Sequence, residues 1–77
     1  MINLAIRAEI ERRKPGKLAQ QVKATLERHC LGHLQCRPVS RRHCSVLAPD
    51  AATALVVDLV LPSEEYTVLL IKDQTAL

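Results

Sequence analysis

Aromatic residues are almost missing from this sequence, which has one tyrosine and no tryptophan or phenylalanine among its 77 residues. A hydrophobic core must therefore be built from aliphatic side chains. Proteins that bind single-stranded nucleic acids usually stack the bases on aromatic rings. The scarcity of aromatic residues therefore weighs against that class of function.

Long apolar runs are missing as well. No apolar stretch approaches the roughly 20 residues of a membrane span, and Arg7 and Glu9 come too early for a secretory signal. The three cysteines are an odd number, which argues against a secreted disulfide framework. We therefore expect a single soluble domain over residues 1–77, located in the cytoplasm and not attached to a membrane.

Charge is distributed unevenly along the chain, whose net charge is +3. Residues 1–44 contain ten Lys or Arg and three acidic residues, whereas residues 45–77 contain one Lys and five acidic residues. Such asymmetry is typical of a chain that binds an anionic partner or assembles with a second copy. A solvated helix face is the alternative interpretation of the basic half.

The strongest local pattern lies in residues 54–72, ALVVDLVLPSEEYTVLLIK, where two apolar runs flank a Pro-Ser-Glu-Glu segment. Pro62 cannot donate to a strand ladder, so it ends the first run. The pattern predicts a β-hairpin in which Leu61 faces Tyr66 across the two strands. Both faces of this hairpin are mostly apolar, so both need to be covered.

Residues 2–14 fit two patterns. Ile2, Ile6 and Ile10 recur at the spacing of a helix face, yet apolar and polar residues also alternate there as in a strand. We predict a helix with Asn3 as its N-cap, because strong helix formers dominate the segment. A strand that opens a β-α-β-β-β order is the alternative.

Residues 17–31 have the clearest helical pattern, and Gly32 stands where a helix C-cap is expected. The apolar stripe of this helix consists of Leu18, Val22, Leu26 and Cys30. Residues 43–48 alternate like a strand, residues 34–38 suggest a short edge strand, and residues 37–42 predict a turn. The fold that we predict is α+β, with one or two N-terminal helices packed on a three- or four-stranded antiparallel sheet ending in a β-hairpin.

Three histidines and three cysteines form the densest group of reactive side chains, and they are His29, Cys30, His33, Cys36, His43 and Cys44. Zinc requires four nitrogen or sulfur ligands, but this spacing contains no C-x-x-C pair. A Cys–His nucleophile pair would need an activating context that the sequence does not offer. We therefore predict no enzymatic activity, no cofactor and no metal, with a small zinc-stapled domain as the second alternative.

Basic side chains gather at two places, which consist of Arg12, Arg13, Lys14 and Lys17, and of Arg37, Arg41 and Arg42. Arginine recognises carboxylates on a protein surface as readily as phosphates. We predict that these seven residues bind a larger protein with an acidic surface, and that the chain is a small regulator or inhibitor. A basic nucleic-acid-binding module is the first alternative.

One layer of helix covers only one face of the predicted hairpin. Leaving large aliphatic side chains of the other face in water would cost roughly 1.5–3 kcal/mol each. We therefore predict a homodimer packed through that second face. Its interface residues would be Val56, Asp58, Val60, Leu69 and Ile71.

Overall fold

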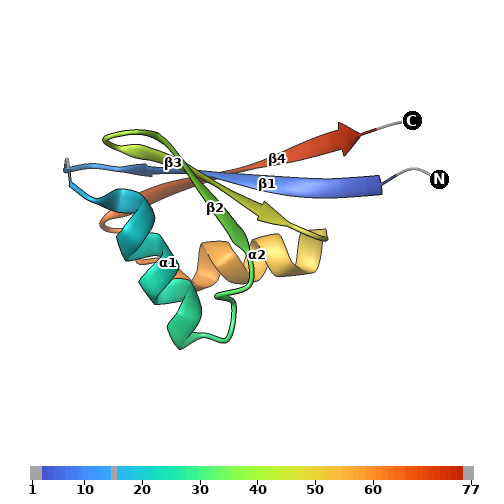
Figure 1. Cartoon of the computed structure of the whole chain (residues 1–77), viewed down its shortest axis with the longest axis horizontal. Helices are drawn as coiled ribbons and strands as arrows, with labels where there is room; N and C mark the ends of the chain where they lie inside the picture. Colours follow the sequence, from blue (N-terminus) through green and yellow to red (C-terminus); the bar gives the residue numbers. More distant parts are fainter. Residues whose placement is uncertain (1–2, 15, 76–77) are drawn as a thin grey trace.

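The computed structural model describes residues 3–14 and 16–75, with side-chain surroundings for residues 6–14 and 16–71. The elements are β1 (Asn3–Arg12), α1 (Leu18–Arg28), β2 (Gln35–Ser40), β3 (His43–Ala48), α2 (Ala51–Val60) and β4 (Tyr66–Thr75). The strands form one antiparallel sheet in the order β2-β3-β1-β4, and both helices lie on the same side of it (Figure 1). The predicted α+β class is confirmed, and of the predicted three or four antiparallel strands the sheet has four. This topology is the split β-α-β, or ferredoxin-like, arrangement.

The prediction of a helix over residues 2–14 is wrong, and so is the N-cap role of Asn3. Residues 3–12 form β1, the strand that was the alternative, and β1 pairs with β3 on one side and with β4 on the other. Ala8 and Ile10 are fully buried beneath the helices. Two strand partners and a buried alternating face therefore outweigh the helical propensity of the segment. Ile2 lies outside the described residues.

The predicted hairpin over residues 54–72 is also wrong, because its first arm is helical. The carboxylate of Asp50 accepts a hydrogen bond from the backbone N–H of Thr53 at 2.7 Å, and this N-cap starts α2. Ala54 and Val57 are buried three residues apart, at helical spacing. A run that is apolar at nearly every position fits a strand and a helix alike, and so the local pattern misled the prediction.

The second arm is a strand, β4, but it pairs with β1 and not with residues 54–61. Tyr66 therefore lies opposite Arg12 and not opposite Leu61. Of the two helices, only α1 comes from the N-terminal half, whereas α2 comes from the segment that was assigned to a strand.

The predicted helix over residues 17–31 is confirmed as α1, except at its C-terminal end. The helix ends at Arg28, and Cys30 adopts a left-handed backbone with a φ of 61°. The backbone N–H groups of Leu31 and Cys30 donate to the carbonyls of Leu26 and Glu27 at 2.7 and 3.2 Å, which is the Schellman pattern. The left-handed cap position therefore belongs to Cys30 and not to Gly32, and Cys30 is exposed instead of lying on the apolar stripe.

The strand predicted at residues 43–48 is confirmed as β3. The edge strand before it runs further than expected, because β2 continues to Ser40 across an irregularity in register between Pro38 and Ser40. The turn between β2 and β3 is therefore shorter than the predicted residues 37–42 and consists of Arg41 and Arg42.

The core lies between the two helices and the sheet and is almost entirely aliphatic, as the composition requires. Its largest fully buried side chains are Ile10, Leu26, Val22, Val46, Val57 and Cys44. The single aromatic residue, Tyr66, is 6% exposed and joins this core.

Candidate docking surface

One face of the sheet is covered by α1 and α2, and no helix among the described residues lies on the other (Figure 1). We call this second surface the open face. A hollow of about 810 Å³ lies over it. The side chains that line the hollow belong to Arg7, Glu9, Glu11, Gln35, Arg37, Val39, His43, Ser45, Leu47, Thr67, Val68, Leu69 and Ile71.

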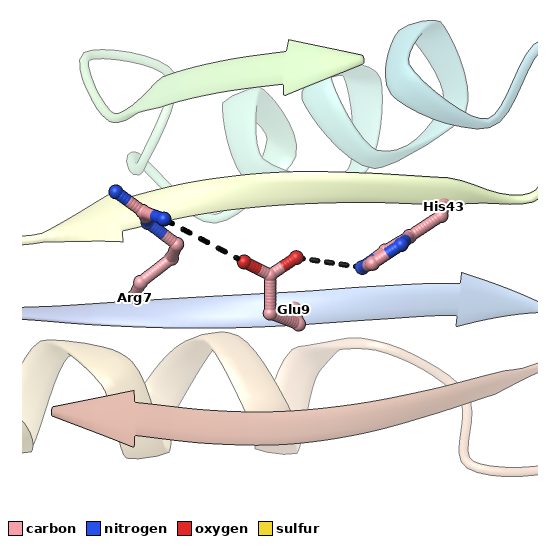
Figure 2. A network of polar contacts seen from close by, with 3 residues as sticks. All are labelled: Arg7, Glu9 and His43. Carbon is pink, nitrogen blue, oxygen red and sulfur yellow. Dashed lines mark ion pairs between the residues drawn. The ribbon is translucent and has the colours of Figure 1, made fainter. Parts of the chain in front are cut away.

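A charged group occupies the middle of the open face. Figure 2 shows Glu9 of β1 between Arg7 of the same strand and His43 of β3. The Oε1 atom of Glu9 lies 4.0 Å from Nη1 of Arg7, and its Oε2 atom lies 2.6 Å from Nε2 of His43. The side chain of Glu9 is only 17% exposed, so this carboxylate is held partly below the surface.

The contact between Glu9 and His43 depends on the protonation of the imidazole. It becomes an ion pair when His43 is protonated. Apart from this contact, the buried Oε2 atom has no hydrogen-bond partner among the described residues. The centre of the open face therefore holds a carboxylate whose hydrogen-bonding capacity is not fully used.

Large aliphatic side chains surround this charged centre. Leu69 is 61% exposed, Val39 55%, Ile71 41% and Leu47 37%. They lie on β4, β2 and β3, so the apolar groups flank the central strand on both sides. The open face consequently combines apolar contact area with charges of both signs.

The two basic groups of the sequence meet at one end of the sheet. The backbone N–H of Arg12 donates to the carbonyl of Arg42 at 2.7 Å, and that of Arg13 donates to the carbonyl of Glu65 at 3.3 Å. These bonds join the end of β1 to the β2–β3 turn and to the segment before β4. We call the resulting surface the basic end, which consists of Arg12, Arg13, Lys14, Arg41 and Arg42.

Three of the residues predicted to bind a partner, Arg12, Arg37 and Lys17, have surroundings that differ from one another. The guanidinium of Arg12 donates a hydrogen bond to the side-chain carbonyl of Gln21 and lies 6.0 Å from the centre of the Tyr66 ring. Arg12 is therefore held by the fold. Arg37 lies on the open face and not in a turn, and Lys17 is exposed at the N-cap of α1.

The five residues predicted for a dimer interface do not share one sheet face. Val56, Asp58 and Val60 belong to α2, which lies over the covered face, whereas Leu69 and Ile71 point to the open face. The prediction placed them together because it treated both segments as strands of one hairpin. Their exposure remains relevant, since Val56 and Asp58 on α2 and both β4 residues are exposed.

The histidines and cysteines are spread over different surfaces. Cys44 is fully buried on the covered face, while the next residue toward the N-terminus, His43, lies on the open face. Cys30 is exposed and Cys36 is half-buried. Among the described residues, no three His, Cys, Asp or Glu side chains are grouped so that they could hold a metal ion.

The buried thiols are poor nucleophiles. Burial raises the pKa of Cys44 to about 12, and the charges of Cys36 and Glu9 act in the same direction. Burial also raises the pKa of Cys36, against a smaller opposite effect of Lys23. Nucleophilic attack requires the thiolate, so burial disfavours the reactive form of both side chains.

Sequence reasoning missed Glu9 and His43 at the charged centre of the open face, and Leu47 beside them. The signal was present as alternation: Arg7, Glu9 and Glu11 are two residues apart and share one face of any strand. It was lost because the segment was assigned to a helix.

Comparisons with protein-family models, with curated proteins and with solved structures found no match to the chain. In the part of the chain that the structure describes, neither helix is long and apolar enough to cross a membrane.

Proposed function

We propose that the chain is a small non-enzymatic regulator or inhibitor that docks on a larger protein through the open face and the adjoining basic end. The observation that carries this proposal is a helix-free sheet face with exposed aliphatic side chains around a charged centre. Fold class alone would not support a function, because this topology serves many activities.

The composition of the open face favours a protein as its partner. Burying an exposed Leu or Ile side chain contributes roughly 1.5–3 kcal/mol, and Leu69 and Ile71 are 61% and 41% exposed. Domains that bind RNA on a four-stranded sheet stack bases on aromatic residues of the central strands. Here those strands present Glu9, Glu11 and His43 instead, and the two carboxylates repel phosphates.

The charge at the edge of this surface favours an acidic partner. Arg37 lies on the open face, opposite Ser45 of β3, and Arg41 and Arg42 form the exposed turn that follows β2. Guanidinium groups bind carboxylates in a bidentate manner. A partner that presents acidic side chains beside an apolar patch would satisfy both parts of the surface. Three free thiols support our placement of the chain in a reducing compartment such as the cytoplasm.

A second candidate function is nucleic-acid binding at the basic end. The gathering of Arg12, Arg13, Lys14, Arg41 and Arg42 favours it, because cationic groups on neighbouring segments can neutralise several phosphates. Such binding would be restricted to the basic end, since Tyr66 is buried and the open face carries carboxylates.

The test begins with affinity purification of the partner from the native host and measurement of its affinity. Replacement of Arg37, Arg41 and Arg42 by Ala should leave the melting temperature nearly unchanged and weaken binding at least about tenfold, because charged hydrogen bonds contribute ~1.5–3 kcal/mol each. Unchanged affinity would remove this surface from the site, and loss of folding would assign the arginines a structural role.

A matched comparison separates specific contacts from net charge. The pair Arg41→Ala and Arg42→Ala removes two charges from the basic end, and the pair Lys23→Ala and Arg28→Ala removes two from α1. Only the first pair should weaken partner binding. If the chain instead binds random DNA or RNA, the first pair should reduce the salt dependence of that binding by about one unit per side chain.

We also propose that the chain forms a homodimer. Five of the seven exposed large aliphatic side chains among the described residues belong to α2 and β4. They are Leu55, Val56, Leu59, Leu69 and Ile71. Two copies that bury these groups would reduce the apolar surface left in water.

A further inference from the structure

We infer that two copies of the chain pair edge to edge through β4. The two β4 strands would run antiparallel across a two-fold axis, so that the four-stranded sheets join into one sheet of eight strands. This inference rests on the homodimer proposed above and specifies its surface, and it is independent of which larger protein is bound.

The two edges of the sheet differ in a way that favours β4. The β2 edge has six residues, contains Pro38 and has an irregular register between Pro38 and Ser40. Proline and bulges are devices that prevent an edge strand from pairing with another chain. The β4 edge has ten residues without proline or glycine, and its charged residues, Lys72 and Asp73, come after the apolar run of residues 66–71. The chain therefore protects one edge and leaves the other open.

Helix α2 reaches β4 and carries exposed apolar side chains. It contacts β1, β3 and β4 of the sheet, and its Leu55, Val56 and Leu59 are 53%, 41% and 82% exposed. Neighbouring strands are ~4.8 Å apart, so a helix centred over β1 would lie ~7 Å from the two-fold axis. The two α2 helices would then be ~14 Å apart, beyond the 8–10 Å of closely packed helices, so the paired β4 strands would supply the main contact.

A second copy fits this edge better than a foreign strand does, because the surface is self-complementary. A two-fold axis sets the same apolar strand against itself, with α2 of each copy on the same side of the joined sheet. Residues 51–61 and β4 contain three charged residues, Asp58, Lys72 and Asp73, and these have both signs, so little like-charge repulsion arises between the copies.

The antiparallel arrangement also keeps the basic ends of the two copies apart. The basic end lies next to the start of β4, because Arg13 donates to the carbonyl of Glu65. A strand of ten residues is ~34 Å long. The basic ends of the two copies would therefore lie at opposite ends of the paired strands, well beyond the ~8 Å screening length of physiological salt.

Edge pairing would place the two open faces on one side of the joined sheet. A dimeric partner could then engage both faces at once, and linked sites of this kind raise avidity without any new contact. Pairing of the β4 edges would leave Leu47, on the inner strand β3, exposed on each open face.

The first experiment measures the oligomeric state by light scattering at micromolar concentration. The wild-type chain should be a dimer, and the double variant Leu69→Lys with Ile71→Lys should raise the dimer dissociation constant at least tenfold. The control is Leu47→Lys, which adds one such charge to the same face but on β3. It should leave the dimer unchanged, and circular dichroism and thermal melting should show that each variant is folded.

Each other outcome contradicts the inference in a distinguishable way. A wild-type monomer would overturn the homodimer together with edge pairing. A dimer that Leu47→Lys disrupts would place the interface on the open face and overturn edge pairing alone. A dimer that resists every one of these substitutions would exclude β4 as the interface. None of these results touches docking on a larger protein, which is measured separately.

A second measurement detects the pairing directly. Single cysteines are introduced along residues 67–73 in a chain whose exposed thiol is removed by Cys30→Gly. Cα atoms of directly opposed residues in antiparallel strands are ~4.5–5.5 Å apart, which suits a disulfide. Oxidation should yield a covalent dimer at one or two of these positions and none with Leu47→Cys. No cross-link at any position would overturn the inference.

Discussion

Replacing Cys30 by glycine is expected to stabilise the protein. Cys30 follows the last residues of α1 and has a φ of 61°, the single positive φ found for a non-glycine residue in the described chain. The N–H groups of Cys30 and Leu31 close the Schellman pattern, so the position cannot relax without breaking both hydrogen bonds. A residue with a Cβ atom is therefore held in a backbone conformation that favours glycine.

The size of the effect follows from two opposing terms. A left-handed backbone costs a residue with a Cβ atom about 1–2 kcal/mol, and this cost disappears in the glycine variant. Glycine also gives the unfolded chain more freedom, which offsets about 0.4–1 kcal/mol. The free energy of unfolding should rise by about 0.5–1 kcal/mol, which corresponds to an increase in melting temperature of about 2–8 °C for a domain of this size.

The control for this prediction is Cys30→Ala, which removes the same exposed thiol but keeps the Cβ atom. Thermal and urea unfolding of both variants should show that alanine changes stability little while glycine increases it. If the glycine variant is no more stable than the alanine variant, the backbone at this position is not strained and the reasoning fails. If both variants are equally stabilised, the thiol itself is responsible.

Two further predictions concern titratable groups. In the folded protein at pH 8 a thiol reagent should modify the exposed Cys30 rapidly and Cys44 slowly, because burial raises the pKa of Cys44 to about 12. In denatured protein the reagent should detect all three thiols. Equal rates for Cys30 and Cys44 in the folded state would contradict the burial of Cys44. The hydrogen bond from Thr53 lowers the pKa of Asp50, so its stabilising effect is present above the ordinary carboxyl pKa and is lost as the pH falls through the lower value of the folded state. Asp50→Asn retains a capping oxygen and should flatten this dependence of stability on acid pH. Asp50→Ala should flatten it too and should also lower the melting temperature at pH 7. If the alanine variant melts like the wild-type protein, Asp50 does not cap α2.

Where apolar residues follow the spacing of a helix alone or of a strand alone, the local pattern was sufficient to predict the element. The stripe of Leu18, Val22 and Leu26 predicts α1, and alternation at residues 43–48 predicts β3. Composition also required an aliphatic core and, with these elements, an α+β fold. These features follow from side-chain chemistry and spacing, which are properties of the chain before it folds.

Where the spacing of apolar residues fits a helix and a strand equally well, only the tertiary structure decided which of the two forms. The segment that became β1 has strong helix formers, but its position between β3 and β4 gives residues 6–11 strand partners on both sides. The segment that became α2 is apolar on nearly every side, and packing over β1, β3 and β4 selects the helix that Asp50 caps. Local propensity contributes less free energy than these contacts, so it did not control either outcome.

The same division applies to the candidate site. The basic residues could be identified from the sequence, but their meeting at the basic end depends on backbone hydrogen bonds between distant segments. These bonds run from Arg12 to Arg42 and from Arg13 to Glu65, about 30 and 50 residues further along the chain. The pairing of Glu9 with His43 likewise requires the register of β1 against β3. The sequence by itself determined which charges and aliphatic groups the protein has, whereas the long-range pairing of strands decided which of them share a surface.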